Sequence, residues 1–397
     1  MKKIIVISEY FYPSTRTDAI LVTQIAKKFF QMENVDLKVI STTPLEKGDE
    51  IDKIESQVIR LKNSSLSDTN IIIRILKFLI LTFRLSFQTI KTVKKGNIVF
   101  STTNPIFLIP VLVILKKIIS FKYILLVYDV FPENLSSAKL LNNKTILYKI
   151  IKFFYDYSYK NVDCLVVIGR DMKEVINKKV NNKVPISIIE NWCDLKNITP
   201  ISKKESKIIQ KLNLEDKKVF TFSGNLGRVQ GIANLLKASL LVKDNSFRLL
   251  FIGSGVMQKE IEKFIKETKS VNVLFAGSFP IEMQNDFLNA CDISIISLSK
   301  NMYGLGVPSK SYYNMAAAKP LLYIGEKNSE IDLVINEHKI GWSVEPENPY
   351  ELAKVIDTIC NDFKSIENRG KKSRMVVENY FTKDIILNKY EKMIEKI

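Results

Sequence analysis

The chain has 397 residues, of which 46% are hydrophobic, and it carries a formal net charge of +17 at pH 7. This hydrophobic fraction is ordinary for a folded protein and argues against a largely disordered chain. Four scattered cysteines and a single histidine argue against a disulfide-rich scaffold and a zinc site, so we expect reduced cysteines in the core and no bound metal.

Short apolar runs alternate with helical patterns through the first half of the chain. We expect strands at 4–8, 37–41, 58–61, 98–101, 123–128, 164–168 and 186–189. The expected helices between them are 19–30, 71–93, 106–118, 145–160 and 170–180. Strands that alternate with helices predict a parallel, doubly wound α/β sheet. We assign this first domain to residues 1–195, with the polar run 194–206 as a linker.

Polar residues follow two of these strands, at the edge where open α/β sheets bind ligands. Asp129 and Glu133 come after the strand at 123–128. A carboxylate there could take a proton from the hydroxyl of a substrate that accepts a transferred group. The alternative is structural, with Asp129 capping a loop and Glu133 opening a helix. Glu9 and Arg16 follow the first strand and are candidates for contact with a phosphate of the acceptor or donor.

Basic charge is concentrated in residues 51–150, which hold 15 Lys or Arg and 5 Asp or Glu. Within this window, 71–95 mixes bulky apolar residues with Arg74, Lys77 and Arg84. These interior charges argue against a spanning helix and predict a basic amphipathic helix lying on an anionic membrane. A core helix with a solvated basic face is the alternative. No nucleic-acid-binding motif accompanies the charge, so we expect no nucleic-acid partner.

The second half repeats the alternation of strands and helices. We expect strands at 219–222, 248–252, 271–275, 293–297, 320–324 and 341–344, which predict a second domain over 196–380. A last helix is expected at 383–396. The chain begins Met-Lys-Lys and leads directly into a strand without a signal-peptide pattern, which predicts a cytoplasmic protein.

Two glycine-rich loops follow strands of the second domain. The first, Ser-Gly-Asn-Leu-Gly-Arg-Val-Gln-Gly at 223–231, offers Gly224, Asn225 and the guanidinium of Arg228 to a phosphate. The second, Phe-Ile-Gly-Ser-Gly at 251–255, is a weaker signal, because Gly253 could serve only to shape a turn.

A third loop, Gly-Leu-Gly-Val-Pro-Ser-Lys at 304–310, precedes a helix of small residues expected at 312–318. The unpaired N–H groups and partial positive charge of a helix start favour a phosphate. Ser309 could cap this helix, and Lys310 adds an ammonium. We interpret the segment as a pyrophosphate clamp, with an ordinary loop-to-helix junction as the alternative.

These motifs, in this order, resemble the donor domain of GT-B glycosyltransferases. The resemblance is to the retaining branch, similar to glycosyltransferase family 4, that builds bacterial capsule, exopolysaccharide and O-antigen repeat units. It extends over nearly the whole chain and includes Ser-Glu-Tyr-Phe-Tyr-Pro at 8–13 and Tyr-Asp-Val-Phe-Pro-Glu at 128–133. It implies two Rossmann-like domains around a cleft, with a last segment, 381–397, that crosses back to the first domain.

The resemblance also implies an activity. An N-acetylated hexosamine or deoxyhexosamine would pass from a UDP-sugar, without a metal or other cofactor, to a saccharide on a polyprenyl-pyrophosphate lipid at the inner face of the cell membrane. A sugar-nucleotide 2-epimerase and a non-catalytic sugar-nucleotide-binding scaffold are the alternatives. The latter is favoured by a departure from the family pattern, whose two glutamates fall on Leu305 and Tyr313 here. The family uses them to hold the donor sugar and ribose. Glu330 is a candidate replacement at the ribose, or else a helix-start residue.

Overall fold

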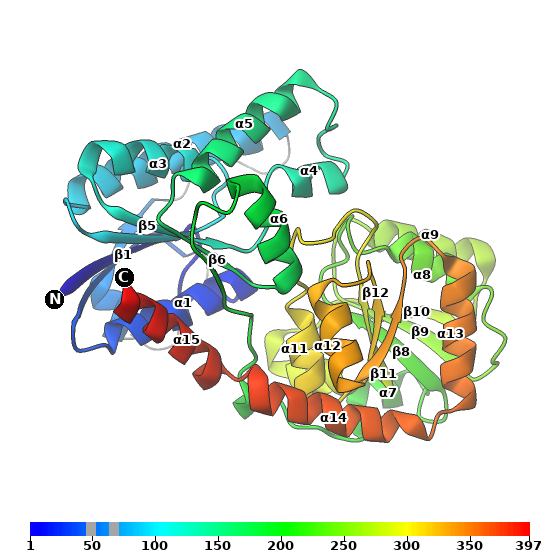
Figure 1. Ribbon diagram of the computed structural model, residues 1–397. Coiled ribbons are helices and arrows are strands. Elements are labelled where there is room, and N and C mark those ends of the chain that lie inside the picture. The colour runs from blue at the N-terminus through cyan, green and yellow to red at the C-terminus, as the bar shows by residue number, and fades with distance from the viewer. Residues whose placement is uncertain (45–52, 63–70) are drawn as a thin grey trace.

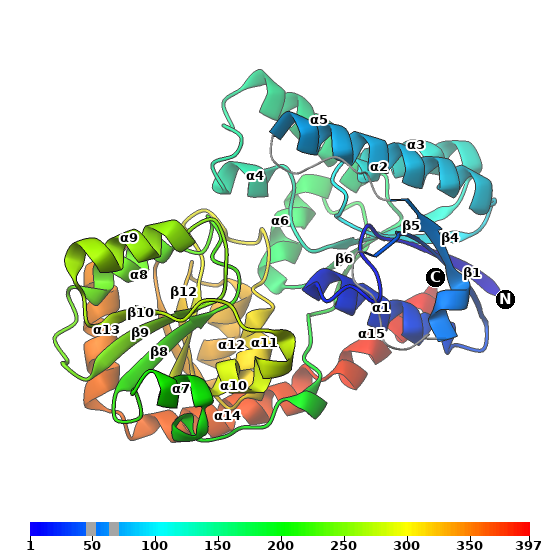
Figure 2. The same ribbon diagram turned by 180° about the vertical axis from the view of Figure 1, so that it is seen from behind.

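The computed structural model describes residues 1–44, 53–62 and 71–397, which form two α/β halves (Figures 1 and 2). The first half contains a seven-stranded sheet in the order β3-β2-β1-β4-β5-β6-β7, and the second a six-stranded sheet in the order β10-β9-β8-β11-β12-β13. The paired strands of both sheets run parallel. The predicted pair of doubly wound sheets is therefore confirmed.

The central strands of the first sheet are apolar along nearly their whole length. Side chains of β1, β4, β5 and β6 are buried on both faces, as parallel sheets covered by helices require. The strands of this sheet are β1 (Lys2–Ile7), β2 (Val35–Thr42), β3 (Val58–Leu61), β4 (Ile98–Thr102), β5 (Lys122–Val127), β6 (Cys164–Val167) and β7 (Ile186–Ile188).

Helices cover both faces of the first sheet (Figures 1 and 2). Three of them, α2 (Ile71–Thr92), α3 (Leu108–Ile119) and α5 (Ile146–Lys160), lie next to one another on one face. On the same face, α5 also contacts α6 (Arg170–Val180). The opposite face carries α1 (Thr17–Phe30). The short helix α4 (Glu133–Ser137) follows β5 and begins within the turn that carries the predicted carboxylates.

The second sheet is enclosed in the same way. Its strands are β8 (Lys218–Ser223), β9 (Phe247–Ile252), β10 (Val273–Phe275), β11 (Ile293–Ser297), β12 (Leu321–Ile324) and β13 (Gly341–Val344). Its helices are α7 (Lys207–Lys211), α8 (Ile232–Ser239), α9 (Gln258–Thr268), α10 (Gln284–Asn289), α11 (Lys310–Ala316), α12 (Glu330–His338), α13 (Pro349–Asn361) and α14 (Ser365–Tyr380). Helix α8 packs on α13, whereas α11 and α12 pack on α14.

The last helix, α15 (Lys383–Lys396), lies against α1 of the first half (Figure 1). Lys28 and Glu391 form an ion pair of 2.7 Å between the two helices. The backbone N–H of Cys193 donates to the carbonyl oxygen of Phe381 at 3.1 Å, so the two connections between the halves are hydrogen-bonded to each other. The ends of the chain are thereby fixed to the same half.

Two further expectations can be compared with the fold. All four cysteines are buried and unpaired, as predicted. The polar run 194–206 is more ordered than a plain linker, because it contains two short 3₁₀ turns, Leu195–Asn197 and Lys203–Glu205, with Asp194 and Ser202 capping them. In the described part of the chain, none of the helices is both long enough and apolar enough to pass through a lipid bilayer.

Candidate active site

A cavity of about 400 Å³ lies between the two halves. Its volume falls within the range of roughly 300–1,000 Å³ that is typical of small-molecule sites. Its walls come from the start of α1, from loops at the carboxyl ends of strands in both sheets, and from the segment before α11. The lining residues are Thr17, Asp18, Leu21, Tyr128, Asp129, Asn134, Ile168, Asn191, Gly224, Asn225, Val229, Gln230, Leu298, Met302, Gly306, Val307, Pro308, Ser309 and Lys310.

Lys310 supplies the positive charge of this cavity. Among the described lining residues it is the one Lys or Arg. Its ammonium nitrogen lies 3.5 Å from the centroid of the Phe222 ring and has no hydrogen-bond partner. Burial lowers the pKa of Lys310 to about 7, because an apolar environment disfavours the charged amine. A buried, unpartnered ammonium at a cavity wall is positioned to pair with an anionic ligand.

The two glycine-rich loops of the second half pack backbone against backbone. Gly224 and Gly253 have φ values of +118° and +134°, which glycine adopts readily. A Cβ on Gly253 would lie 1.9 Å from the carbonyl oxygen of Gly224, so no other residue fits there without movement. Gly224 and Asn225 line the cavity, whereas Gly253 lies outside the lining and packs against the backbone of Gly224. Close backbone packing thus accounts for Gly253.

The bounds of α11 and the role of Ser309 differ from the prediction. Helix α11 begins at Lys310, two residues before the expected start, and it ends at Ala316. Ser309 is the residue before the helix, but its side chain makes no capping hydrogen bond. The expectation that Ser309 caps the helix is therefore wrong. Its place in the cavity wall leaves its hydroxyl available to a ligand.

Asp129 lies on the opposite wall, just after β5. Its carboxylate accepts a hydrogen bond of 2.7 Å from the side-chain amide of Asn134. Burial, together with the nearby negative charge of Asp18, raises the pKa of Asp129 to about 6. The next residue, Val130, donates its N–H to the carbonyl oxygen of Leu305 at 3.0 Å, which ties this loop to the second half. A carboxylate with such a pKa can accept a proton at neutral pH.

Comparison with known proteins agrees with this geometry. A family model described as "Glycosyl transferases group 1" matches residues 204–376. The probable glycosyltransferase WbjE of Pseudomonas aeruginosa is 38% identical over 309 residues, which cover 78% of this chain and 76% of the relative. The chain belongs to the glycosyltransferases.

Solved structures resemble the glycosyltransferase over its whole length. Sucrose-phosphate synthase from Thermosynechococcus elongatus matches with a TM-score of 0.79 and 16% identity, covering 100% of this chain and 99% of that one. Anabaena HepE in complex with UDP-glucose matches with a TM-score of 0.70 and 14% identity, and both chains are covered completely. At these identities the likeness shows the fold, which is the predicted GT-B arrangement.

Glu133 does not line the cavity of the glycosyltransferase. Its carboxylate oxygen Oε1 accepts hydrogen bonds from Lys152 at 2.9 Å and from Lys179 at 2.6 Å. Lys179 also pairs with Asp156 at 2.6 Å. Lys152 belongs to α5 and Lys179 to α6, and they bind the Glu133 carboxylate outside the cavity lining. The expectation that Glu133 could take a proton from an acceptor hydroxyl is therefore wrong. The structural alternative, a glutamate that opens a helix, describes its place in α4.

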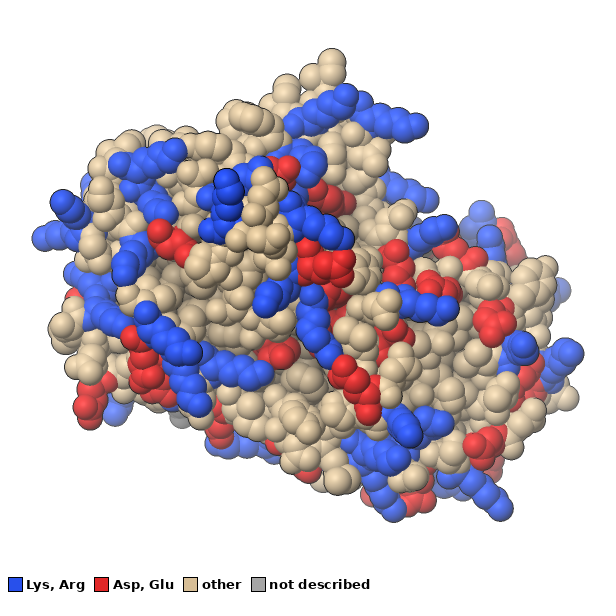
Figure 3. Space-filling model, viewed as in Figure 1, with Lys and Arg blue, Asp and Glu red and all other residues tan. Residues whose placement is uncertain are grey.

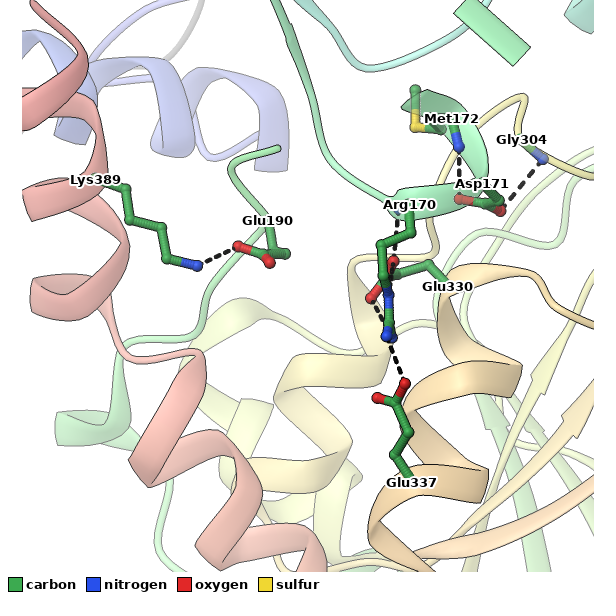
Figure 4. A network of polar contacts seen from close by, with 8 residues as sticks. All are labelled: Arg170, Asp171, Met172, Glu190, Gly304, Glu330, Glu337 and Lys389. Atoms are coloured by element: carbon green, nitrogen blue, oxygen red, sulfur yellow. Dashed lines mark hydrogen bonds and ion pairs between the residues drawn. The ribbon is translucent and has the colours of Figure 1, made fainter. Parts of the chain in front are cut away.

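Glu330 is not among the residues that line the cavity, and Figure 4 shows it bonded to Arg170. It is 3% exposed, and its carboxylate accepts hydrogen bonds from Arg170 of the first half. These come from the backbone N–H at 2.7 Å, from Nε at 3.0 Å and from Nη2 at 3.1 Å. Glu337, about two helical turns further along α12, accepts a hydrogen bond of 2.6 Å from the same guanidinium. Both carboxylate oxygens of Glu330 bind Arg170 and so connect the two halves of the protein. The structure therefore gives Glu330 a structural contact in place of the predicted ribose contact.

The two possible roles of Glu330 predict different results for Glu330→Ala. We expect its free energy of unfolding to fall by roughly 1–3 kcal/mol, because the backbone N–H and the guanidinium of Arg170 lose their hydrogen bonds to a buried carboxylate. The Kd for UDP should stay within about twofold of the wild-type value. Denaturant unfolding and calorimetric titration measure the two quantities. Glu337→Ala, at a half-exposed position, is the matched control and should lose less stability. If Glu330→Ala kept its stability but bound UDP much more weakly, the result would instead support a contact of Glu330 with the ribose.

In the loop after β8, one predicted donor residue, Arg228, lies outside the cavity lining, and one residue that was not predicted, Gln230, belongs to it. Arg228 is exposed and lies outside the cavity lining, contrary to its expected contact with a phosphate. Gln230, which the sequence did not single out, lines the cavity instead. Its side-chain oxygen is buried without a hydrogen-bond partner. The signal that could have found it is its position directly before Gly231, the N-cap residue of α8.

Glu9 and Arg16 face a second, smaller cavity of about 230 Å³. Its other lining residues are Tyr10, Arg74, Lys77, Phe78 and Asn104. The Arg16 guanidinium lies 4.0 Å from the centroid of the Tyr10 ring and pairs with Asp18 at 3.2 Å. Burial raises the pKa of Glu9. Because Asp18 lines the first cavity, it connects the two sites. The sequence had assigned the cations of α2 only to a membrane surface.

Leu305 and Tyr313, the positions at which the resemblance implies two glutamates, both pack into the structure. Leu305 is buried, and its carbonyl oxygen accepts the hydrogen bond from Val130. Tyr313 packs against the hydrophobic core, and burial raises its pKa to about 12. The two carboxylates among the described residues of the cavity wall, Asp18 and Asp129, both come from the first half. The second half therefore presents neutral groups and the Lys310 ammonium.

Proposed function

We propose that this glycosyltransferase moves a sugar from a UDP-sugar to a lipid-linked saccharide during synthesis of a bacterial cell-surface polysaccharide. The observation that carries the proposal is the buried ammonium of Lys310, which lacks a hydrogen-bond partner and belongs to a residue that lines the cavity between the two halves. The diphosphate gains negative charge as the glycosidic bond breaks, and a preorganised cation stabilises that charge. The likeness to HepE, whose structure contains UDP-glucose, favours UDP as the nucleotide.

In the proposed reaction, Asp129 takes the proton of the acceptor hydroxyl, and the hydroxyl oxygen bonds to the anomeric carbon on the face that the diphosphate leaves. The bond between the anomeric carbon and the phosphate oxygen breaks, and the released nucleoside diphosphate pairs with Lys310. Gly224, Asn225 and Ser309, which line the same cavity, are proposed to contact its phosphates. The resemblance of the motifs favours retention of the anomeric configuration, transfer of an N-acetylated hexosamine or deoxyhexosamine, and neutralisation of the leaving group by Lys310 rather than by a metal ion.

The acceptor side is assigned to the second cavity. Arg16, Arg74 and Lys77 line it, and guanidinium and ammonium groups suit a pyrophosphate. This position favours a polyprenyl-pyrophosphate acceptor, whose lipid would extend toward α2. We propose that α2 rests on the inner face of the cell membrane and that the enzyme is a peripheral protein of the cytoplasmic side.

The test is calorimetric titration of UDP and GDP without metal, repeated with Mg²⁺, followed by assays with UDP-sugars. We expect UDP to bind at least about tenfold more tightly than GDP, and added Mg²⁺ to change little. Formation of a new sugar nucleotide without acceptor would identify an epimerase. Tight binding without any turnover, even with lipid-linked saccharides, would indicate a scaffold. Binding of neither nucleotide by the folded protein would contradict the proposal.

A further inference from the structure

Large apolar side chains are exposed on three adjacent helices of the first half. Of the 24 exposed large hydrophobic residues among those described, fourteen lie on α2, α3 and α5. The most exposed include Phe83 on α2 at 71%, Ile118 on α3 at 72%, and Ile146 and Phe153 on α5 at 76% and 67%. Because these helices lie side by side over one face of the sheet (Figures 1 and 2), their exposed side chains form one surface, which we call the α2–α3–α5 face. Exposed apolar surface on this scale marks an interaction site.

The same helices are strongly basic. They carry nine Lys or Arg and a single acid, Asp156, which is paired with Lys152 and Lys179. Two of the lysines lie over aromatic rings of this face, Lys91 over Phe87 at 4.2 Å and Lys117 over Tyr157 at 4.9 Å. In Figure 3, Lys and Arg side chains lie over and around this half of the molecule, with uncharged side chains between them. The face thus combines exposed aromatic and aliphatic groups with cations.

We propose that the α2–α3–α5 face docks on an anionic lipid bilayer, with α5 contributing as much of the contact as α2. Apolar side chains would enter the boundary between headgroups and acyl chains, while the cations pair with anionic headgroups. The charge argues against the other occupants. A second copy of the chain on a two-fold axis would oppose this set of cations with the same set. Protein interfaces are moreover usually depleted in lysine.

This docking deepens the proposed function and rests on it for the orientation of the substrates. Arg74, Lys77 and Phe78 belong to α2 and also line the second cavity. Docking would therefore bring that cavity to the level of the lipid headgroups. A pyrophosphate at the headgroup level could enter it while its polyprenyl chain stays in the bilayer. The donor cavity, between the halves, would remain accessible to a nucleotide-sugar in water.

The test is cosedimentation of the full chain with vesicles of mixed phosphatidylcholine and phosphatidylglycerol, compared with phosphatidylcholine alone. We expect binding to the mixed vesicles that weakens as salt is added. Phe83→Asp on α2 and Phe153→Asp on α5 should each lower the partition coefficient by about tenfold. Val271→Asp is the matched control, because Val271 is 74% exposed but lies in the second half. This control should bind as the wild type does.

Three outcomes would overturn the docking proposal. Vesicle binding that is as strong in both Phe variants as in the wild type would contradict the docking proposal. Binding lost in Phe83→Asp but unchanged in Phe153→Asp would reduce the contact to α2. A dimer seen by light scattering and dissolved by the same variants would show self-association instead. UDP titration of the same proteins keeps the proposals separate, because the Phe variants should bind UDP normally. Vesicle binding without any nucleotide binding would contradict the proposed function and leave the docking proposal standing.

Discussion

Replacing Asp129 with asparagine is expected to lower kcat by about 10²–10⁴-fold while the affinity for UDP changes little. Asparagine has nearly the shape of aspartate and keeps an oxygen that can accept the hydrogen bond from Asn134. It cannot take a proton from an acceptor hydroxyl. The transfer rate at saturating donor and the calorimetric Kd for UDP measure the two effects.

The pH dependence of wild-type activity provides a second readout of Asp129. Because burial and Asp18 raise the pKa of Asp129 to about 6, kcat should rise as the pH increases through about 6. The folded-state pKa lies above the ordinary value of 3.8. The folded state thus binds more protons between these values, so the unfolding free energy falls as the pH rises through this window. Above it, Asp129→Asn should be at least as stable as wild type, so unfolding would not explain its lost activity.

Glu133→Gln is the matched control for Asp129→Asn. Glu133 belongs to the same turn, but its carboxylate binds Lys152 and Lys179 and does not line the cavity. We expect this variant to lose stability and to retain its transfer rate. A loss of kcat in Glu133→Gln as large as that in Asp129→Asn would contradict the assignment of the base, as would a rate independent of pH near 6.

The strands were predictable because a buried parallel strand consists mostly of apolar residues. The run predicted at 219–222 became β8, Lys218–Ser223, and β11 and β13 have the predicted bounds. The edge that holds the candidate site was predictable for the same reason, since loops at the carboxyl ends of parallel strands share one edge of a sheet. Asp129 and Lys310 therefore line one cavity although 180 residues separate them.

The direction of individual side chains was not predictable, because partners distant in the sequence decide it. Glu330 binds Arg170, 160 residues earlier, and Glu133 binds Lys179, 46 residues later. Neither partner stands out in the sequence. Helix α5 illustrates a different limit. Its apolar residues occupy most sides of the helix, as in a core helix, and only packing against α3 and α6 shows which side stays exposed.

Lys310→Met is expected to change binding and stability in opposite directions. The Kd for UDP should rise at least about tenfold, because the diphosphate loses its cation. The free energy of unfolding at pH 7 should rise by about 1–4 kcal/mol, because methionine can lie against Phe222 without burying an unpartnered amine. Denaturant unfolding and calorimetry measure these effects. Lys327→Met, at an exposed position away from the cavity, is the control and should change neither quantity appreciably.

Proton linkage provides a sharper test of Lys310. Its pKa is about 7 in the folded protein and close to the ordinary 10.5 in the unfolded chain. Between these values the unfolded state binds more protons, so wild-type unfolding free energy should rise with pH and the advantage of Lys310→Met should shrink. At about pH 8 the free protein holds Lys310 largely neutral, and UDP binding should take up a proton. Calorimetry in two buffers of different ionisation enthalpy detects this uptake, which Lys310→Met should abolish. A buried cation that serves a ligand destabilises the free protein until its anion binds. Two results would therefore make Lys310 a structural amine instead: proton uptake that is unchanged in Lys310→Met, or a variant that loses stability and still binds UDP normally.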